Sequence, residues 1–277
     1  MQDSHLIGVF DSGVGGLTVA EQIDRELPGV PFIFFGDTQH VPYGNRSVSE
    51  VVSLIDSICH HLISSGAEVL VMACNTSSAL AFDHVVAWSP APIIGIIDEA
   101  AKAAVRATRN GRIGLMANPL TAASGAYEKA CAQAYASASL KGESAASTVK
   151  VTPVGCPKLV PLIEKGLVSG PEAHEAVREY LRPLQEAGVD TLILGCTHYP
   201  FVRPVIEELA GSDLKIIDPA RYVVKRLREL GFDCSPASAK ASRLYQASGS
   251  AADFAKIGSQ LLGHAIGPVE RVELSKK

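Results

Sequence analysis

Two cysteines, Cys74 and Cys196, each follow a short apolar run: residues 69–80 read VLVMACNTSSAL and residues 192–201 read LILGCTHYPF. Such a run is typical of a buried strand that delivers the next side chain to its carboxyl edge. A helix-capable segment follows each cysteine, and the amide hydrogens and dipole of a helix N-terminus favour thiolate. Two thiols on opposite sides of a planar carbanion could remove a proton from one face and return a proton to the other.

Three further side chains could set the protonation states of these thiols: Asp11, Glu164 and His198. The predicted helix N-termini also present unpaired amide hydrogens, which can bind carboxylates without an arginine. Hydroxyl and amide side chains near the two cysteines add to this potential anion site: Ser12, Asn75, Thr76, Ser77 and Thr197. The pattern therefore predicts a small anionic substrate.

The sequence also carries traces of an internal duplication. The words IIDEA (96–100) and IIDPA (216–220) place Asp98 24 residues after Cys74 and Asp218 22 residues after Cys196. A weaker echo, IGVFDSG and IGLMANP, begins at residues 7 and 113. Matches in the same order and spacing indicate duplicated halves. We expect two related lobes that face each other across a cleft, each presenting one thiol.

Composition limits the possible classes of protein. With 277 residues, 47% of them hydrophobic, the chain has enough material for two cores. A net charge of −4 argues against nucleic acid as a partner. The apolar runs are too short to span a membrane, and the N-terminus lacks a signal-peptide pattern, so we expect a cytoplasmic protein. The six cysteines form no CxxC pair, which argues against structural zinc and a disulfide framework.

Strand and helix patterns alternate almost throughout the chain. The alternation predicts an α/β fold of mainly parallel sheets flanked by helices, in which ligands bind beyond the carboxyl ends of the strands. The expected strands cover residues 6–10, 31–35, 69–73, 93–97, 112–116, 149–154, 190–195, 214–217, 243–247 and 269–274. Residues 121–137 are helical in pattern and grade into residues 134–148, which are small and polar and predict a surface loop. Residues 155–166 predict a short irregular segment that carries Glu164.

Each candidate side chain also has a simpler structural interpretation. A cysteine in an apolar segment is most often a buried structural thiol, and this role suits Cys59, Cys131, Cys156 and Cys234. Asp11 and His198 could serve only as helix caps, and Glu164 could be an ordinary surface residue. The segment DSGVGG (11–16) lacks both the GK[ST] ending of a phosphate loop and the GxGxxG spacing, which argues against a nucleotide site.

Seven short sequence motifs occur in this order along the chain: FDSGVGGLTV, GDTQHVPYGNRS, ACNTSSA, GIIDEA, GCPKLVPLIEKG, LGCTHYPF and VERVEL. Together they resemble the glutamate racemase family over nearly the whole chain. The resemblance implies a two-base racemase, without cofactor or metal, that interconverts L- and D-glutamate and supplies D-glutamate for bacterial peptidoglycan. It implies that Cys74 and Cys196 are the catalytic pair, with Asp11 assisting Cys74 and with Glu164 and His198 assisting Cys196.

The same resemblance implies which residues hold glutamate: Asp11, Ser12, Tyr43, Gly44, Asn75, Thr76, Thr197 and His198. Asn118 departs from the family pattern, in which threonine is often found. Two pseudo-symmetric lobes are implied, with the active site in the cleft between them. Residues 1–98 with 211–277 would form the lobe of Asp11 and Cys74, and residues 99–210 the lobe of Glu164, Cys196 and His198. A homodimer is also implied.

Three alternatives remain open. A racemase of the same superfamily could act on aspartate or another amino acid. A non-catalytic, two-lobed amino-acid binding protein would hold its ligand without exchanging the Cα proton. Cys196, His198 and Asp11 could instead form a metal site or a thiol hydrolase triad, although Cys-x-His does not match the usual zinc spacing.

Overall fold

The computed structural model of the chain describes residues 5–140, 146–232 and 241–274. Its contacts divide the chain into two units, Met1–Ile96 with Val223–Lys277, and Ile97–Tyr222. The chain re-enters the first unit at Val223 rather than near Gly211, because the strand Lys215–Ile217 pairs with Thr191–Gly195 of the second sheet.

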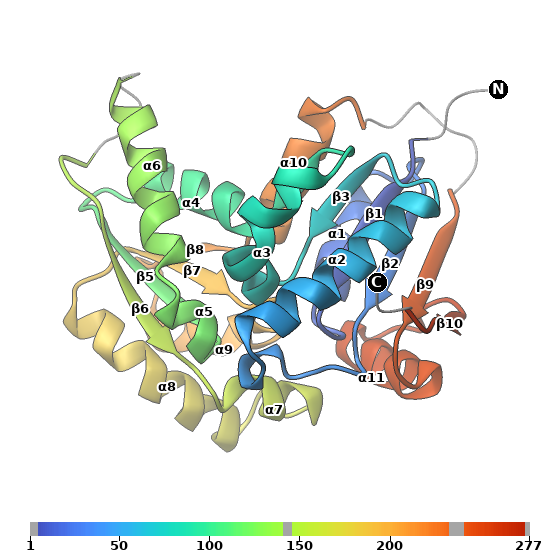
Figure 1. Cartoon of the computed structure of the whole chain (residues 1–277). Helices are drawn as coiled ribbons and strands as arrows, with labels where there is room; N and C mark the ends of the chain where they lie inside the picture. The colour runs from blue at the N-terminus through green and yellow to red at the C-terminus, as the bar shows by residue number, and fades with distance from the viewer. Residues whose placement is uncertain (1–4, 141–145, 233–240, 275–277) are drawn as a thin grey trace. The chain divides into compact units, whose positions relative to one another are not determined.

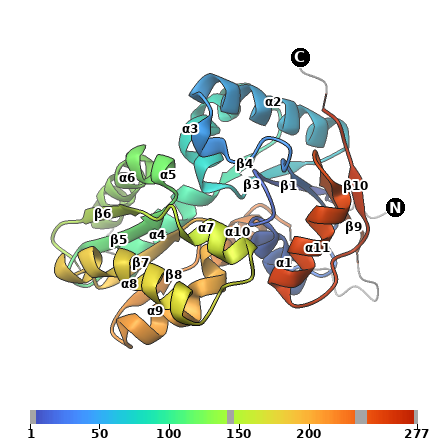
Figure 2. The same cartoon turned by 90° about the horizontal axis from the view of Figure 1, so that it is seen from below.

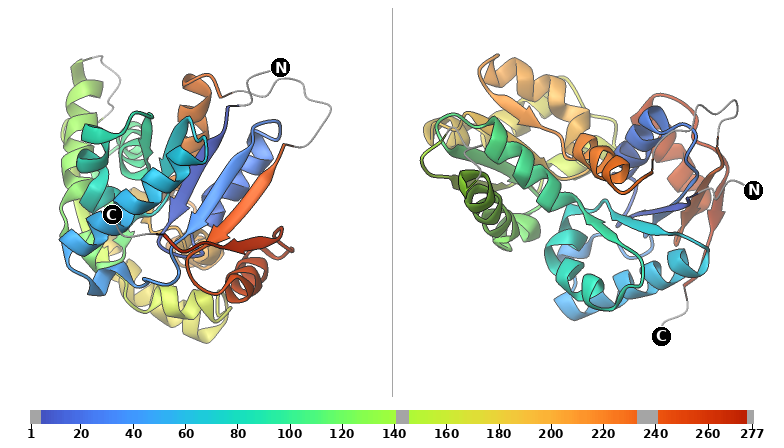
Figure 3. Two further views of the ribbon diagram at one scale, coloured as in Figure 1. Left: turned by 45° about the vertical axis from the view of Figure 1, so that its right-hand side comes forward. Right: turned by 90° about the horizontal axis from the view of Figure 1, so that it is seen from above.

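The first unit is built on a six-stranded sheet in the order β10-β9-β2-β1-β3-β4. Every neighbouring pair is parallel. Figure 1 labels the strands, and the left view of Figure 3 shows the blue strands β1 and β2 beside the orange β9. Their bounds are β1 Ile7–Asp11, β2 Phe32–Gly36, β3 Val69–Met72, β4 Ile93–Gly95, β9 Arg243–Ala247 and β10 Val269–Arg271.

Helices cover both faces of this sheet. Their bounds are α1 Leu17–Glu26, η1 Tyr43–Asn45 (a single 3₁₀ turn), α2 Val48–Ser64, α3 Asn75–Trp88, α10 Ala220–Glu229 and α11 Ala251–Leu262. Helices α2 and α3 pack on the face that receives Phe10, Ile33 and Phe35. Phe34 points the opposite way and contacts Phe254 of α11, as expected from the alternation of side chains along a strand. Figure 2 shows α2 and α3 on one side of the sheet and α1 and α11 on the other.

The second unit has a four-stranded parallel sheet in the order β6-β5-β7-β8. Its strands are β5 Arg112–Ala117, β6 Lys150–Gly155, β7 Thr191–Gly195 and β8 Lys215–Ile217. Its helices are α4 Ile96–Ala107, α5 Pro119–Ala123, α6 Ala126–Leu140, α7 Leu159–Glu164, α8 Pro171–Glu186, the 3₁₀ turn η2 Tyr199–Val202 and α9 Arg203–Ala210. Helices α4 and α6 lie on one face and α8 and α9 on the other (Figure 2). The predicted fold class, parallel sheets flanked by helices, is confirmed.

The two sheets share one strand order, which confirms the internal duplication. β2-β1-β3-β4 of the first unit corresponds to β6-β5-β7-β8 of the second. Ile7 pairs with Val69 in the first sheet, and Ile113 pairs with Thr191 in the second. The echo that begins at residues 7 and 113 is therefore in structural register.

The second sequence echo is not in register. Ile216 and Ile217 belong to β8, whereas Ile96 and Ile97 already lie in α4. The strand residues equivalent to 216 and 217 are Ile93 and Ile94 of β4. The expected strand at 93–97 is therefore wrong in its second half, because the run IIGII is divided between a short strand and the first turn of a helix.

Two expected loops are partly helical. α6 continues to Leu140, so the helical pattern predicted to residue 137 is confirmed for 126–137 and the predicted loop is wrong for residues 138–140. Alanine is the strongest helix former, and it is frequent there. The part of that prediction at 141–145 lies outside the described residues. Glu164 is the last residue of the helix α7, not part of an irregular segment. The expected strand at 269–274 ends at Arg271.

Candidate active site

In the first unit, Asp11 and Cys74 lie at the carboxyl edge of the sheet. Asp11 is the last residue of β1, and Cys74 is the N-cap of α3, two residues after β3 ends. The Cys74 thiol donates to Ser12 Oγ at 3.4 Å, and its Sγ accepts the Ser77 amide at 3.5 Å. The Gly13 amide donates to Asp11 Oδ2 at 2.9 Å. The structure thus brings three predicted residues, Asp11, Ser12 and Cys74, to one edge.

The Cys74 thiol is not activated in the way that its helix position predicts. Burial raises the pKa of Cys74, the charge of Asp11 raises it further, and the hydrogen bonds from Ser12 and Ser77 lower it without reversing the shift. The expectation that a helix N-terminus favours thiolate at this residue is not met, because the net shift of the Cys74 pKa is upward. Cys74 is only 6% exposed, and burial is the largest cause of the upward shift.

The glycine-rich turn after β1 explains how α1 approaches Asp11. A Cβ at Gly16 would lie 2.4 Å from the Cβ of Asp11. No side chain larger than hydrogen fits there without moving the carboxylate. Gly16, the last glycine of the DSGVGG segment, therefore allows the chain to pack closely against Asp11.

The other predicted binding residues of the first unit lie on α3 and on the loop after β2. Asn75 and Thr76 are the first two residues of α3, and both are buried. Tyr43 is buried and Gly44 is exposed in the turn η1. The Tyr43 hydroxyl donates to Asp37 Oδ2 at 2.6 Å, so it bonds to a residue outside the predicted set.

In the second unit, three predicted residues form a chain of contacts. Glu164 Oε1 lies 3.0 Å from His198 Nε2, and His198 Nδ1 lies 3.8 Å from Cys196 Sγ. When Nε2–H donates to the carboxylate, the neutral imidazole presents Nδ1 to the sulfur as a proton acceptor. This is the arrangement of thiol, base and orienting acid that nucleophile and acid–base sites share. The acid in this series of contacts is Glu164.

The segment after Cys196 differs from the segment after Cys74. Residues Tyr199–Val202 form a 3₁₀ turn before the helix α9, so the expected α-helix N-terminus directly behind Cys196 is not present. Thr197 is buried beside it. Asn118 follows β5 as Ser12 follows β1 and caps α5, accepting the Leu120 amide at 3.0 Å through Oδ1.

Cys74 and Cys196 occupy equivalent positions in the two sheets. Cys74 lies five residues after Val69, which pairs with Ile7, the first residue of β1. Cys196 lies five residues after Thr191, which pairs with Ile113, the corresponding residue of β5. The two thiols are therefore related by the duplication, as the sequence predicts.

Sequence reasoning missed a buried polar cluster in the first unit. It consists of the buried Asp37 after β2 and the buried Ser248 after β9, joined by the half-buried His40 of the next loop. Asp37 stands at a strand end like Asp11, and that position was an available signal. Ser248 carried no comparable signal, because nothing local in the sequence places β9 beside β2.

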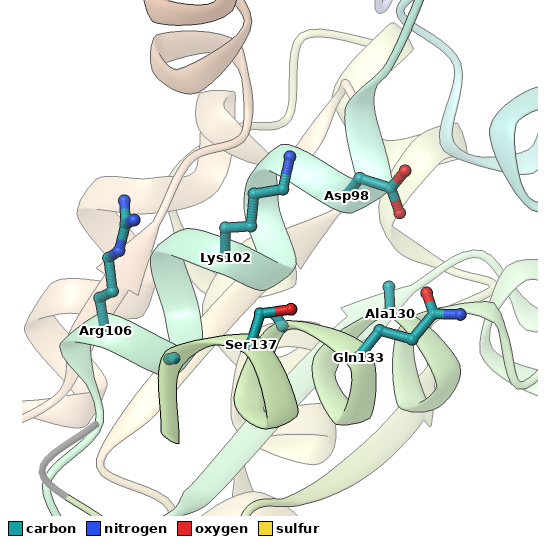
Figure 4. A pocket seen from close by; sticks show the side chains of 8 residues that line it. Asp98, Lys102, Arg106, Ala130, Gln133 and Ser137 are labelled. Carbon is teal, nitrogen blue, oxygen red and sulfur yellow. The ribbon is translucent and has the colours of Figure 1, made fainter. Parts of the chain in front are cut away.

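A hollow of about 410 Å³ lies between α4 and α6 of the second unit. Figure 4 shows Lys102 and Arg106 on one wall and Ala130 and Ser137 on the other. Lys102 pairs with Glu99 at 2.7 Å. Among the described residues that line this hollow there is no predicted site residue.

The remaining described cysteines are free and buried. Burial raises the pKa of Cys131 and of Cys156 to about 12 and raises that of Cys59 still further, so these thiols are inert at neutral pH. Cys234 lies outside the described residues. Within the described ranges, no three metal-ligating side chains gather, and no helix there has both the length and the apolar character needed to cross a membrane.

Comparison with known proteins places this arrangement in a family. The model of the Asp/Glu/Hydantoin racemase family matches residues 7–227. The chain is 42% identical to the glutamate racemase of Desulforudis audaxviator over 275 residues, covering 96% of this chain and 97% of that protein.

Solved structures of glutamate racemases also match this chain. The crystal structure of glutamate racemase isoform RacE1 from Bacillus anthracis matches with a TM-score of 0.86 at 34% identity and covers 100% of both chains. The glutamate racemase from Francisella tularensis, in complex with D-glutamate, matches with a TM-score of 0.85 at 28% identity, covering 99% of this chain and 100% of that one. With matched thiols at the same register of two duplicated sheets, the chain belongs to the Asp/Glu/Hydantoin racemase family.

Proposed function

We propose that this chain is a glutamate racemase, an isomerase that interconverts L- and D-glutamate without a cofactor and supplies D-glutamate for the bacterial cell wall. The observation that carries the proposal is the register equivalence of Cys74 and Cys196. A duplicated fold that keeps one thiol at the same strand end in each half is the arrangement that a two-base exchange at one carbon needs.

The proposed reaction moves one proton off Cα and another onto it. Cys196 gives its proton to Nδ1 of His198, and the resulting thiolate removes the Cα proton while the electron pair stays in an ene-diolate. The Cys74 thiol then protonates Cα from the opposite face. Its raised pKa supports this assignment, because it keeps the Cys74 thiol protonated at neutral pH. The mechanism requires both sulfurs to reach Cα from opposite sides.

The proposed substrate contacts are those implied by the family resemblance. The residues are Asp11, Ser12, Tyr43, Gly44, Asn75, Thr76, Thr197 and His198. Support comes from the amide groups at the N-terminus of α3, which begins at Asn75 beside Cys74 and can hold a carboxylate. Glu164 supports the orientation of His198 through the 3.0 Å contact.

Glutamate is favoured over aspartate by the names of the relatives that match along nearly the whole chain, one of them crystallised with D-glutamate. A non-catalytic binding protein would leave two register-matched thiols without a role. We extend the proposal to a cytoplasmic homodimer. Sedimentation of the purified chain tests the dimer, and a monomer at all concentrations would contradict it.

Incubation in deuterated water tests the function and the substrate together. L-glutamate and D-glutamate should each gain deuterium at Cα as they are converted to the other enantiomer, and L-aspartate should gain much less. Cys74→Ala and Cys196→Ala should each abolish racemisation, and Cys59→Ala, which changes a core thiol, should retain it. Binding of glutamate without exchange would indicate the binding protein, and faster exchange of aspartate would indicate the related racemase.

A further inference from the structure

The first unit contains a buried carboxylate, Asp37, that the proposed proton transfers do not use. Asp37 directly follows β2 and is 1% exposed. Its Oδ2 accepts the hydroxyl of Tyr43 at 2.6 Å. Its Oδ1 accepts the hydroxyl of Ser248 at 2.6 Å and lies 2.7 Å from Nδ1 of His40. Both carboxylate oxygens are therefore occupied by side chains, which come from the loop after β2 and from the end of β9.

These bonds close the loop that joins β2 to the turn η1. Ser248 donates its backbone amide to the Gly36 carbonyl at 3.0 Å, and its Oγ accepts the Gln39 amide at 3.0 Å. His40 Nδ1 joins the same carboxylate from inside the loop. The two ends of the segment 37–43 are thus tied to one charged group, and the end of β9 fixes that group in place.

The hydrogen bond from the Tyr43 hydroxyl to Asp37 is a strong one. Tyr43 is 3% exposed, and a hydroxyl that donates to an ionised carboxylate makes a short, charge-assisted bond. Burial, followed by the charge of Asp37, raises the pKa of Tyr43 well above its ordinary value. The phenol therefore stays protonated and keeps donating over the physiological pH range.

We propose that Asp37 is a positioning residue for the racemisation proposed above: it holds the Tyr43 ring, and with it the neighbouring Gly44 amide, in the geometry that receives glutamate. This inference rests on the proposed function and on the assignment of Tyr43 and Gly44 to substrate binding. Asp37 acts through Tyr43 and exchanges no proton with substrate, so its loss should weaken binding much more than it slows turnover.

The duplication shows that this anchor is specific to the lobe that carries Tyr43. Phe32 of β2 pairs with Ile7, and Val151 of β6 pairs with Ile113. The position equivalent to Asp37 is therefore occupied by Cys156. Cys156 donates to the Val154 carbonyl and carries no charge at neutral pH, so the second lobe lacks a carboxylate at this point.

A hollow of about 240 Å³ borders the anchor and offers an independent test. Asp37, Gln39, His40 and Ser248 are among the residues that line it. A water molecule takes roughly 30 Å³ of liquid volume, so a small carboxylate such as formate fits the space. Formate could then replace a side chain removed at position 37.

The primary experiment measures KM and kcat for L-glutamate in wild type, Asp37→Asn, Tyr43→Phe and the double variant. Asp37→Asn and Tyr43→Phe should each raise KM about tenfold or more, the size expected for a lost bond to a charged group, with kcat changed less than about threefold. The double variant should be no worse than the worse single variant, because both changes remove one interaction. Unchanged KM in Tyr43→Phe, or additive effects in the double variant, overturns the proposal.

A matched control is Asp190→Asn in the second unit. Asp190 also accepts bonds from a hydroxyl and backbone amides, namely Thr108 Oγ1 at 2.6 Å, Arg109 at 2.7 Å and Asn110 at 2.8 Å. This variant should lose stability and keep its KM. If Asp190→Asn raises KM as much as Asp37→Asn does, the effect is general destabilisation and the proposal fails.

Chemical rescue tests whether position 37 needs a carboxylate, and the change in KM relative to kcat distinguishes a positioning role of Asp37 from a role in proton transfer. Asp37→Ala should show a raised KM that added formate lowers toward the wild-type value, and Asp37→Asn, whose side chain still fills the site, should not respond. Absence of rescue together with an unchanged KM in Asp37→Asn overturns the proposal. A collapse of kcat at unchanged KM also overturns it by assigning a proton-transfer role to Asp37. A wild-type protein that racemises no amino acid overturns the proposed function instead, which keeps the two failures distinct.

Discussion

Asp11 and Cys74 lie at the ends of the adjacent parallel strands β1 and β3, and the negative charge of the carboxylate raises the pKa of the thiol. Burial acts in the same direction and is the larger cause. The resting thiol is therefore a proton donor, held by Ser12 and Ser77 and shielded from water. This relationship gives Asp11 an electrostatic role that can be measured without substrate.

The first prediction concerns the reactivity of Cys74. Iodoacetamide should modify Cys74 slowly at pH 7 and progressively faster as the pH rises, because the thiolate is the reactive form. Asp11→Asn removes the charge that raises the thiol pKa and should increase the rate at any given pH near neutrality. Peptide mapping by mass spectrometry measures the rate at Cys74 alone. A slower reaction in Asp11→Asn would contradict the electrostatic assignment.

The second prediction is that loss of His198 lowers kcat more than loss of Glu164 does. His198→Asn removes the proton acceptor 3.8 Å from Cys196 and should lower kcat about a hundredfold or more, the usual range for a general acid–base group. The Glu164 side chain is 41% exposed, and a single hydrogen bond contributes about 1 kcal/mol. Glu164→Gln should therefore lower kcat less than about fivefold. Steady-state kinetics checks the order, and equal losses in both variants would refute it.

The third prediction follows from the close packing at Gly16. Gly16→Ala puts a methyl group 2.4 Å from the Cβ of Asp11, and such overpacking costs about 1–3 kcal/mol. Both thermal stability and activity per folded molecule should fall, because the carboxylate must move. Gly267→Ala is the control, since its nearest atoms lie 3.6 Å away. Wild-type activity in Gly16→Ala would show that the position of Asp11 is not critical.

The fourth prediction concerns stability in acid. Burial works to raise the pKa of Asp190, but hydrogen bonds from Thr108, Asn110 and Arg109 together hold that pKa below its ordinary value. A carboxylate with a lowered folded-state pKa stabilises the protein above its unfolded pKa of about 3.9 and loses that contribution as the pH falls through the folded value.

Asp190→Asn should therefore be less stable than wild type near pH 7, and the difference should shrink below about pH 4. Urea unfolding midpoints of both proteins between neutral and acid pH measure it. A difference that is constant across this range would assign the effect to packing rather than to ionisation.

The sequence by itself determined the alternation of strands and helices, the strand ends that carry Asp11, Cys74 and Cys196, and the family words. These are local properties, because side-chain periodicity and the residue after an apolar run depend only on neighbours in the chain. The duplication was also readable, although the IIDEA and IIDPA echo falls three residues out of structural register. The helical state of Glu164 was not readable, since the flanking prolines and glycines outweighed the short apolar pattern.

The tertiary structure alone decided the partners and the electrostatics of the candidate site. Ser248 reaches Asp37 across 211 residues because β9 inserts beside β2, and Glu164 reaches His198 across 34 residues. The protonation state of Cys74 was decided in the same way, because its burial, which only the folded chain produces, raises the pKa of the thiol. Hydrogen-bond partners and burial depend on which segments pack together in the folded chain, and the local sequence does not specify those contacts.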